Sequence, residues 1–516
     1  MADSIIGNVQ AWILRKRADA LPAGSLRARF VFGTFWALTG TLISQSLQLA
    51  ATILVARWLG KAEYGEIGII KSTVGMFGVF VGLGLGLTAT KYVSELRAED
   101  PARAGRIATL TLTVALISGS VVTLALILLS PWLARHTLAS PAVAGPLAIG
   151  AGLLFFGEVN GVQTCILAGL EAFGTLARVS LWAGLCSFPI ILAATWLWGV
   201  RGAVSGLVAS LALNYLLNHL ALRRETAKAG IPIAYSGFWR EHAVLWSFSL
   251  PAFLSSAVVT PVAWACNAML VNARQGYAEM GLFSAADQWR NIVLFLPGVI
   301  SRVVLPILSS HSKEAAEEAN PFSQTLEAGF SAGVLVAFPL VTALNFGGSL
   351  LIKAYGADFA GLRFPLAGLL YAGGLLAIGT PVGLAVQAKG AMWLGFLNNL
   401  TWSLLLLGSF RFLLVPSAWG LAQAYAFSYL VLSLTFLWFF CKAGYFPWRL
   451  GVRTSLADLS LLLFAFTPLW LPVSLSLRLS PLALALSLIA VWIFLPRNVT
   501  SKLVGASAWI RGGRMD

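Results

Sequence analysis

The chain has 516 residues, of which 58% are hydrophobic and only 11% are charged, with a mean hydropathy of +0.82. Soluble globular proteins carry about 25% charged residues, so this composition excludes a water-soluble fold. The net charge of +15 would suggest a nucleic-acid partner in a soluble protein. Here we attribute it to cytoplasmic loops rich in Lys and Arg, and we expect no nucleic-acid partner.

Apolar runs of about 20 residues recur along the chain, and each could cross a hydrocarbon layer about 30 Å thick as a helix. The predicted spans are 30–55, 67–91, 107–133, 144–170, 176–198, 202–220, 244–271, 282–308, 326–352, 365–386, 393–414, 420–440, 456–473 and 482–495. The sequence therefore predicts an all-α integral membrane protein with about 14 transmembrane helices. We expect no cleaved signal peptide, because no cleavage site follows the first apolar run.

A segment of twelve residues occurs twice, as LVARWLGKAEYG at 54–65 and as LVNARQGYAEMG at 270–281. The copies are 216 residues apart and need no gap, and six positions are identical. A motif that returns between two long apolar runs indicates a duplicated unit, and duplicated halves of transporters pack around a shared central site. We predict two six-helix lobes with pseudo-twofold symmetry around a central cavity, plus two extra C-terminal helices.

Polar links divide the chain at the predicted lobe boundaries. We expect a cytoplasmic basic segment at 1–29, which is either an interfacial helix or a disordered tail, and a basic cytoplasmic tail at 497–516. Between them lie the N-lobe (30–222), a cytoplasmic linker (223–243), the C-lobe (244–442) and the last two helices (443–496). The predicted internal segments hold 23 Lys and Arg against 9 outside, which favours two cytoplasmic termini.

Several of these segments together resemble a known family. The turn LVARWLGKAEYG, the glycine-rich second span and TATKYVSEL at 88–96 resemble the start of polysaccharide-biosynthesis membrane proteins. These are lipid-linked oligosaccharide (O-antigen/polysaccharide) flippases of the multidrug/oligosaccharidyl-lipid/polysaccharide exporter superfamily. The resemblance is sharpest over residues 30–100 and implies a V-shaped cavity lined by spans one, two, seven and eight. Fourteen spans are common among such flippases, whereas drug extruders typically have twelve.

The resemblance implies a non-enzymatic flippase that moves lipid-diphosphate-linked oligosaccharide across the bacterial inner membrane by alternating access. It implies lipid-linked oligosaccharide and membrane lipids as partners, with a polysaccharide polymerase or glycosyltransferases as further candidates, and we expect a monomer. A cation-coupled multidrug exporter is the alternative, and a membrane polymerase or ligase would need a larger external loop. No GxxxxGK[ST] loop occurs, so we expect no ATP hydrolysis and no cofactor.

Charged residues inside the spans are candidates for binding the anionic headgroup, because intramembrane charges are costly and usually functional. Arg290 is the first candidate, since a guanidinium donates two hydrogen bonds to a phosphate. The alternative is a structural pair with Asp287, three residues earlier. Arg302 is a second candidate near the inner end of the same span, unless it extends to the interface. Gln45 and Gln48 share a face of the first span and offer sugar contacts, or else hydrogen bonds between helices.

Lys71 and Asp287 are also 216 residues apart, so the duplication places them at equivalent depths with opposite charges. We predict that they form a gate at the external mouth of the cavity. The alternative is that Lys71 points to the outer interface and Asp287 serves Arg290. Glu158 in the fourth span is a candidate for ion coupling, or a hydrogen-bonded helix contact. The four histidines and four cysteines show no metal-ligand spacing, so no metal site is expected.

Overall fold

The structure is a computed structural model that describes residues 26–82, 84–232, 237–242, 258–310 and 321–495. These residues form helices and no β-strand, and nine of their helices are long and apolar enough to cross a membrane. Two of the nine, α2 (Leu26–Gly82) and α6 (Phe173–Lys228), have 57 and 56 residues. α6 covers two predicted spans, whereas α2 covers the first span and most of the second, whose end at 85–91 belongs to the next helix, α3 (Leu85–Leu96). The prediction of an all-α membrane protein is confirmed.

Both long helices are broken where glycine permits an unusual backbone. Gly60 has φ 76° in α2, at the turn formed by the first motif copy. Gly199 has φ 57° in α6, directly after Trp198. Positive φ values place the Cβ of other residues against their own backbone, so glycine is favoured at both breaks. Each break divides one long helix into two membrane crossings.

The N-lobe contains the helices before the central linker. Besides α2 and α6 it consists of α3 (Leu85–Leu96), α4 (Pro101–His136), η1 (Pro141–Val143) and α5 (Ala144–Gly169). α4 begins at Pro101, whose fixed φ suits the first helical position. The side chain of Asp100 accepts a hydrogen bond of 2.9 Å from the backbone N–H of Arg103 and so caps the helix.

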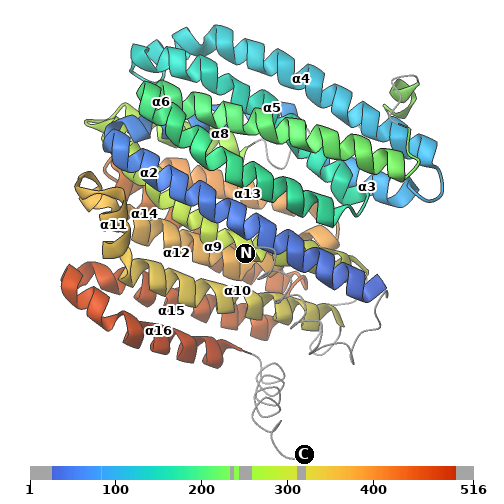
Figure 1. Cartoon of the computed structure of the whole chain (residues 1–516). Coiled ribbons are helices and arrows are strands. Elements are labelled where there is room, and N and C mark those ends of the chain that lie inside the picture. Colours follow the sequence, from blue (N-terminus) through green and yellow to red (C-terminus); the bar gives the residue numbers. More distant parts are fainter. Residues whose placement is uncertain (1–25, 83, 233–236, 243–257, 311–320, 496–516) are drawn as a thin grey trace, which may run out of the picture.

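The C-lobe repeats this arrangement. Its helices are α8 (Val259–Val271), α9 (Gly276–Ser310), α10 (Pro321–Phe346), α11 (Gly348–Tyr355), η4 (Ala357–Leu362), α12 (Arg363–Ala388), α13 (Met392–Gly408), η5 (Ser409–Leu413) and α14 (Ala418–Lys442). In Figure 1 the N-lobe helices α4, α5 and α6 lie on one side and α10 and α12 on the other, with α2 between them. The second motif copy forms the turn from α8 into α9 and contains Glu279. The carboxylate of Glu279 accepts a hydrogen bond of 2.7 Å from the backbone N–H of Ala418.

The two extra helices are attached to the C-lobe. α15 (Trp448–Trp470) and α16 (Val473–Phe494) pack on α10, and α15 also contacts α12 and α14. Arg363 holds the turn between them, because its guanidinium donates to the carbonyl oxygens of Pro468 and Leu471. Figure 1 shows both helices at the outer edge of the C-lobe. They therefore extend one lobe and leave the two-lobed core unchanged.

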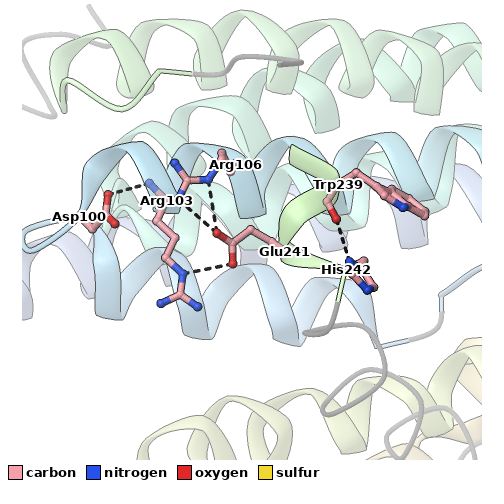
Figure 2. Close-up of polar contacts among 6 residues, drawn as sticks. All are labelled: Asp100, Arg103, Arg106, Trp239, Glu241 and His242. Carbon is pink, nitrogen blue, oxygen red and sulfur yellow. Dashed lines mark hydrogen bonds and ion pairs between the residues drawn. The ribbon is translucent and has the colours of Figure 1, made fainter. Parts of the chain in front are cut away.

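The link between the lobes is partly helical. α6 continues to Lys228, beyond the predicted start of the linker, and η2 (Phe238–Glu241) follows. Glu241 pairs with Arg103 at 3.1 Å and with Arg106 at 3.2 Å, which fastens η2 to α4 (Figure 2). The predicted N-terminal segment is outside the described residues up to position 25, and so is the basic tail. The predicted domain boundaries remain predictions.

Candidate functional site

The two motif copies meet in the middle of the molecule. A Cβ atom on Gly65 would lie 1.9 Å from the carbonyl oxygen of Tyr277, and one on Gly281 would lie 1.9 Å from the carbonyl oxygen of Lys61. Residues 65 and 281 are equivalent in the duplication, and so are 61 and 277. α2 and α9 thus exchange the same contact, as a local twofold axis requires. The structure therefore supports the predicted pseudo-twofold symmetry of the lobes.

The axis passes close to a third equivalent pair. A Cβ on Gly68 would lie 2.0 Å from the Oγ atom of Ser284, its counterpart 216 residues later. Small residues at this crossing let two membrane helices approach to backbone contact. The identical pair Gly65 and Gly281 is therefore explained by the contact between the lobes, whereas Gly60 serves the break in α2. This requirement could not be read from either half alone.

Side-chain hydrogen bonds add to this contact. Tyr277 donates from its hydroxyl to the carbonyl oxygen of Leu138 at 2.7 Å, and Asn272 donates to that of Thr137 at 2.7 Å. Both acceptors follow the end of α4 in the N-lobe, whereas both donors belong to the C-lobe. We call this junction, with Gly65 and Gly281, the closed end. The lobes are fastened together there by backbone packing and by hydrogen bonds.

Beyond the axis, α2 and α9 separate. Nothing lies within 4 Å of a Cβ atom built on Gly75, which is exposed two turns after Gly68. Its equivalent on α9, Asn291, is exposed as well, and Gly298 has open space around its Cβ position. The space beside these positions is therefore not covered by the opposite helix, although α8 still contacts α2 through Asn267, which donates to Ser72 Oγ at 2.8 Å, and Trp264, which donates to Thr73 Oγ1 at 3.0 Å. We call this space the interlobe gap.

Three of the predicted site residues lie at the start of the interlobe gap. Lys71 is exposed one turn after Gly68, and it is near enough to Asp287 for the two charges to interact. Asp287 and Arg290 are partly exposed, at 31% and 15% of their side chains, and Arg290 Nε donates to Asp287 Oδ1 at 2.7 Å. Asn291 donates to the other carboxylate oxygen at 3.3 Å. In this conformation Asp287 is paired with Arg290, and no ion pair joins it to Lys71 in the described part of the chain.

Arg290 is held by two neighbouring helices but retains free hydrogen-bonding capacity. Its side-chain stem packs where Gly373 of α12 leaves room, 2.9 Å from the position of a Cβ there. Its guanidinium carbon lies 5.6 Å from the centre of the Tyr425 ring on α14, a cation–π contact. Within the described residues its two terminal nitrogens make no hydrogen bond. A fixed guanidinium whose two terminal nitrogens are both unused as hydrogen-bond donors is suited to bind a phosphate.

An aromatic cluster beside Arg290 was not predicted from the sequence. Trp402 lies 5.6 Å from Tyr425 and 5.2 Å from Tyr429 between ring centroids, and Phe283 contacts Tyr425 at 5.7 Å. Aromatic residues four apart on an apolar helix have the same spacing whether they pack a core or line a site. The sequence therefore held no signal that separates the two. Only the position of Arg290 distinguishes this cluster.

Gln45 and Gln48 are exposed on the first half of α2. Thr52 and Val55 follow seven residues later on the same faces and are buried, with 7% and 3% exposure. The face that carries the glutamines is thus covered towards the closed end and uncovered away from it. This gradient runs in the same direction as the interlobe gap.

Glu158 and Arg302 lie elsewhere. The Glu158 carboxylate of α5 is 3.4 Å from the Cβ positions of Gly78 and Gly82, beside the end of α2. The neighbouring Asn160 donates to the carbonyl oxygen of Leu211 and accepts from Asn218, so it is committed to helix packing. Arg302 belongs to α9, and its side chain is outside what the structure describes. No cluster of three or more metal-ligating side chains occurs in the described residues.

Comparison with known proteins adds to this geometry. The sequence profile of the family described as "Polysaccharide biosynthesis protein" matches residues 30–312, which is more than half of the chain. The chain belongs to this family. The chain is 26% identical over 439 residues to the EPS I polysaccharide export inner membrane protein EpsE of Ralstonia nicotianae. The match covers 82% of this chain and 96% of the relative. The EpsE protein of Ralstonia solanacearum is 23% identical over 80% of this chain and 94% of its own length.

Solved structures show the same fold. The lipid II flippase MurJ in an inward closed conformation has a TM-score of 0.63 at 16% identity, covering 87% of this chain and 97% of that chain. An inward-facing multidrug resistance MATE transporter of the MOP superfamily has a TM-score of 0.59 at 15% identity, over 83% of this chain and 99% of that chain. At these identities the likeness concerns the fold alone. With the family match, the protein is a membrane protein of the polysaccharide biosynthesis family that has the fold of these transporters.

Proposed function

We propose that the protein is a flippase that translocates lipid-diphosphate-linked oligosaccharide across the inner membrane by alternating access. The observation that carries the proposal is Arg290, a partly exposed guanidinium at the interlobe gap whose terminal nitrogens have no partner among the described residues. A diphosphate that leaves water loses its hydrogen bonds to the solvent, and such donors replace them. The family match and the EpsE relatives support a polysaccharide precursor as the cargo.

The charges around Arg290 fit a negatively charged cargo. Lys71 and Arg290 carry two positive charges against the one negative charge of Asp287. Asp287 accepts a hydrogen bond from the Nε atom of Arg290 and so fixes the guanidinium. The two terminal nitrogens of Arg290 remain available to the ligand. A cation-coupled multidrug exporter would instead need carboxylates to dominate this position. We therefore assign phosphate binding to Arg290, and sugar contacts to the exposed Gln45 and Gln48.

Alternating access is supported by the difference between the two ends of the lobes. We propose that both termini are cytoplasmic, so that the closed end faces outward and the interlobe gap faces the cytoplasm. Arg302 would then lie on the path of a headgroup that enters from the inner leaflet. Lys71 and Asp287 would act as a gate in which Asp287 exchanges Arg290 for Lys71 during transport. A polysaccharide polymerase or glycosyltransferases would supply or consume the cargo.

The proposal is tested by flipping of fluorescent lipid-diphosphate-linked sugar in proteoliposomes that contain the full chain. Arg290→Ala should reduce flipping at least tenfold, because charge-assisted hydrogen bonds contribute about 1.5–3 kcal/mol. Arg290→Lys should restore part of the rate, because it keeps the charge but loses the planar fork. Arg274→Ala is the control, since Arg274 is exposed in the turn before α9. Normal flipping by Arg290→Ala, or export of cationic drugs by the same vesicles, would contradict the assignment.

A further inference from the structure

The N-lobe contains a pocket that is separate from the interlobe gap. It has a volume of about 350 Å³ and lies between α4, α5 and the last third of α6. Leu112 and Leu116 of α4, Val159 of α5 and Leu222 of α6 supply apolar walls. No described residue of the C-lobe lines it. The pocket is therefore a property of the N-lobe alone and does not require the two lobes to meet.

Three polar side chains give this pocket one polar end. Gln163 of α5 is 1% exposed, and its Oε1 atom has no hydrogen-bond partner among the described residues. His219 and Arg223, one turn apart on α6, line the same pocket, and the two side chains lie close enough to interact. Neither forms an ion pair with any described residue. A buried amide oxygen without a partner is unfavourable. The exposed guanidinium of Arg223 has no counter-ion among the described residues, so it remains available to an anionic ligand.

We propose that this pocket binds an anionic phospholipid of the bilayer, with its phosphate on His219 and Arg223. The apolar walls would hold the start of the acyl chains. Gln163 Oε1 needs a donor, which a headgroup hydroxyl such as that of phosphatidylglycerol supplies. Basic pockets between membrane helices are a common form of lipid headgroup recognition. The site would therefore bind a structural or regulatory lipid and not the transported cargo.

The position of the pocket along the helices supports this choice of ligand. Arg223 is near the end of α6 at Lys228, and Ala227 and Ile231 close the rim on the same side. In the orientation proposed above, this level corresponds to the headgroup region of the inner leaflet, where anionic lipids are found. Arg223 is exposed, so its guanidinium can reach a phosphate at the interface. The charges at Arg290 belong to a different helix of the other lobe.

The adjacent Arg224 provides a matched control. It is also exposed, but it is rotated by about 100° around α6 and does not line the pocket. Binding of phosphatidylglycerol and of zwitterionic phosphatidylcholine to the purified full chain would be measured by native mass spectrometry. Arg223→Gln should weaken phosphatidylglycerol binding about tenfold, and Gln163→Leu should weaken it as well. Arg224→Gln should leave it unchanged.

The result can overturn the proposal in three ways. Equal losses in Arg223→Gln and Arg224→Gln would mean that only the general surface charge attracts lipid. Equal affinity of the unaltered chain for phosphatidylcholine would remove the role of the headgroup charge. Displacement of phosphatidylglycerol by a polyprenyl diphosphate at lower concentration would assign the pocket to the cargo. Thermal unfolding of each variant without added lipid checks that a loss of binding does not reflect a loss of fold.

Discussion

The closed end depends on two glycines that permit backbone contact between the lobes. A methyl group on Gly65 or Gly281 would lie 1.9 Å from a carbonyl oxygen of the opposite helix, whereas ordinary Cβ contacts begin at 3.4 Å. The obstructing atoms are backbone atoms of Tyr277 and Lys61, so no side chain can rotate to make room. Gly281→Ala must therefore push α2 and α9 apart at the axis.

The expected size of the effect follows from the cost of overpacking. Inserting a methyl group into a close-packed contact costs about 1–3 kcal/mol, and 1.4 kcal/mol corresponds to a tenfold change in an equilibrium. Because this cost arises only while the end is closed, Gly281→Ala should shift the population about 5- to 150-fold towards states in which that end is open. Gly65→Ala should act alike, because its contact is the symmetry-related copy.

The shift can be measured by spin-label distances across the closed end, between labels on the turn after α4 and the turn before α9. The unaltered chain should give a short distance, and Gly281→Ala should add a longer one. Gly75→Ala is the matched control on α2, since nothing lies within 4 Å of its Cβ position. An unchanged distance distribution in Gly281→Ala, or an equal shift in Gly75→Ala, would refute the reasoning.

Three further predictions concern charged residues. Glu241→Gln should speed hydrogen exchange in η2 while the unfolding temperature stays within about 2 °C, because both arginines are partly exposed and ion pairs in contact with solvent contribute only about 0.2–1 kcal/mol each; a large loss of stability would contradict this. Asp458 on α15 is fully buried and accepts from Ser433, so Asp458→Asn should keep the fold in detergent, whereas Asp458→Leu should lose about 1–3 kcal/mol; equal stability of both variants would be the opposing result. If Lys71 and Asp287 form a gate, Lys71→Glu and Asp287→Lys should each impair flipping and together restore it, and a double variant as slow as the singles would exclude the pairing.

The sequence by itself determined the membrane class and the duplication, and it predicted most of the spans that the described residues contain. Hydropathy sufficed for the spans because a helix in lipid must satisfy its backbone internally and present about 20 apolar residues. The repeat at 54–65 and 270–281 indicated two related lobes, and the structure shows the reason, since Gly65 and Gly281 exchange contacts across one axis. Arg290 could be singled out because a charge within an apolar span is rare.

The tertiary structure alone decided which of these charges and aromatic residues come together. The spacing of Asp287 and Arg290 allowed a pair on one helix, but the position of Tyr425 beside Arg290 depends on how α14 packs on α9. The basic pair at the N-lobe pocket had no signature, because His219 and Arg223 lie where a positive inner loop is expected anyway. Contacts between helices far apart in the sequence are set by side-chain packing in three dimensions, and a one-dimensional pattern does not contain them.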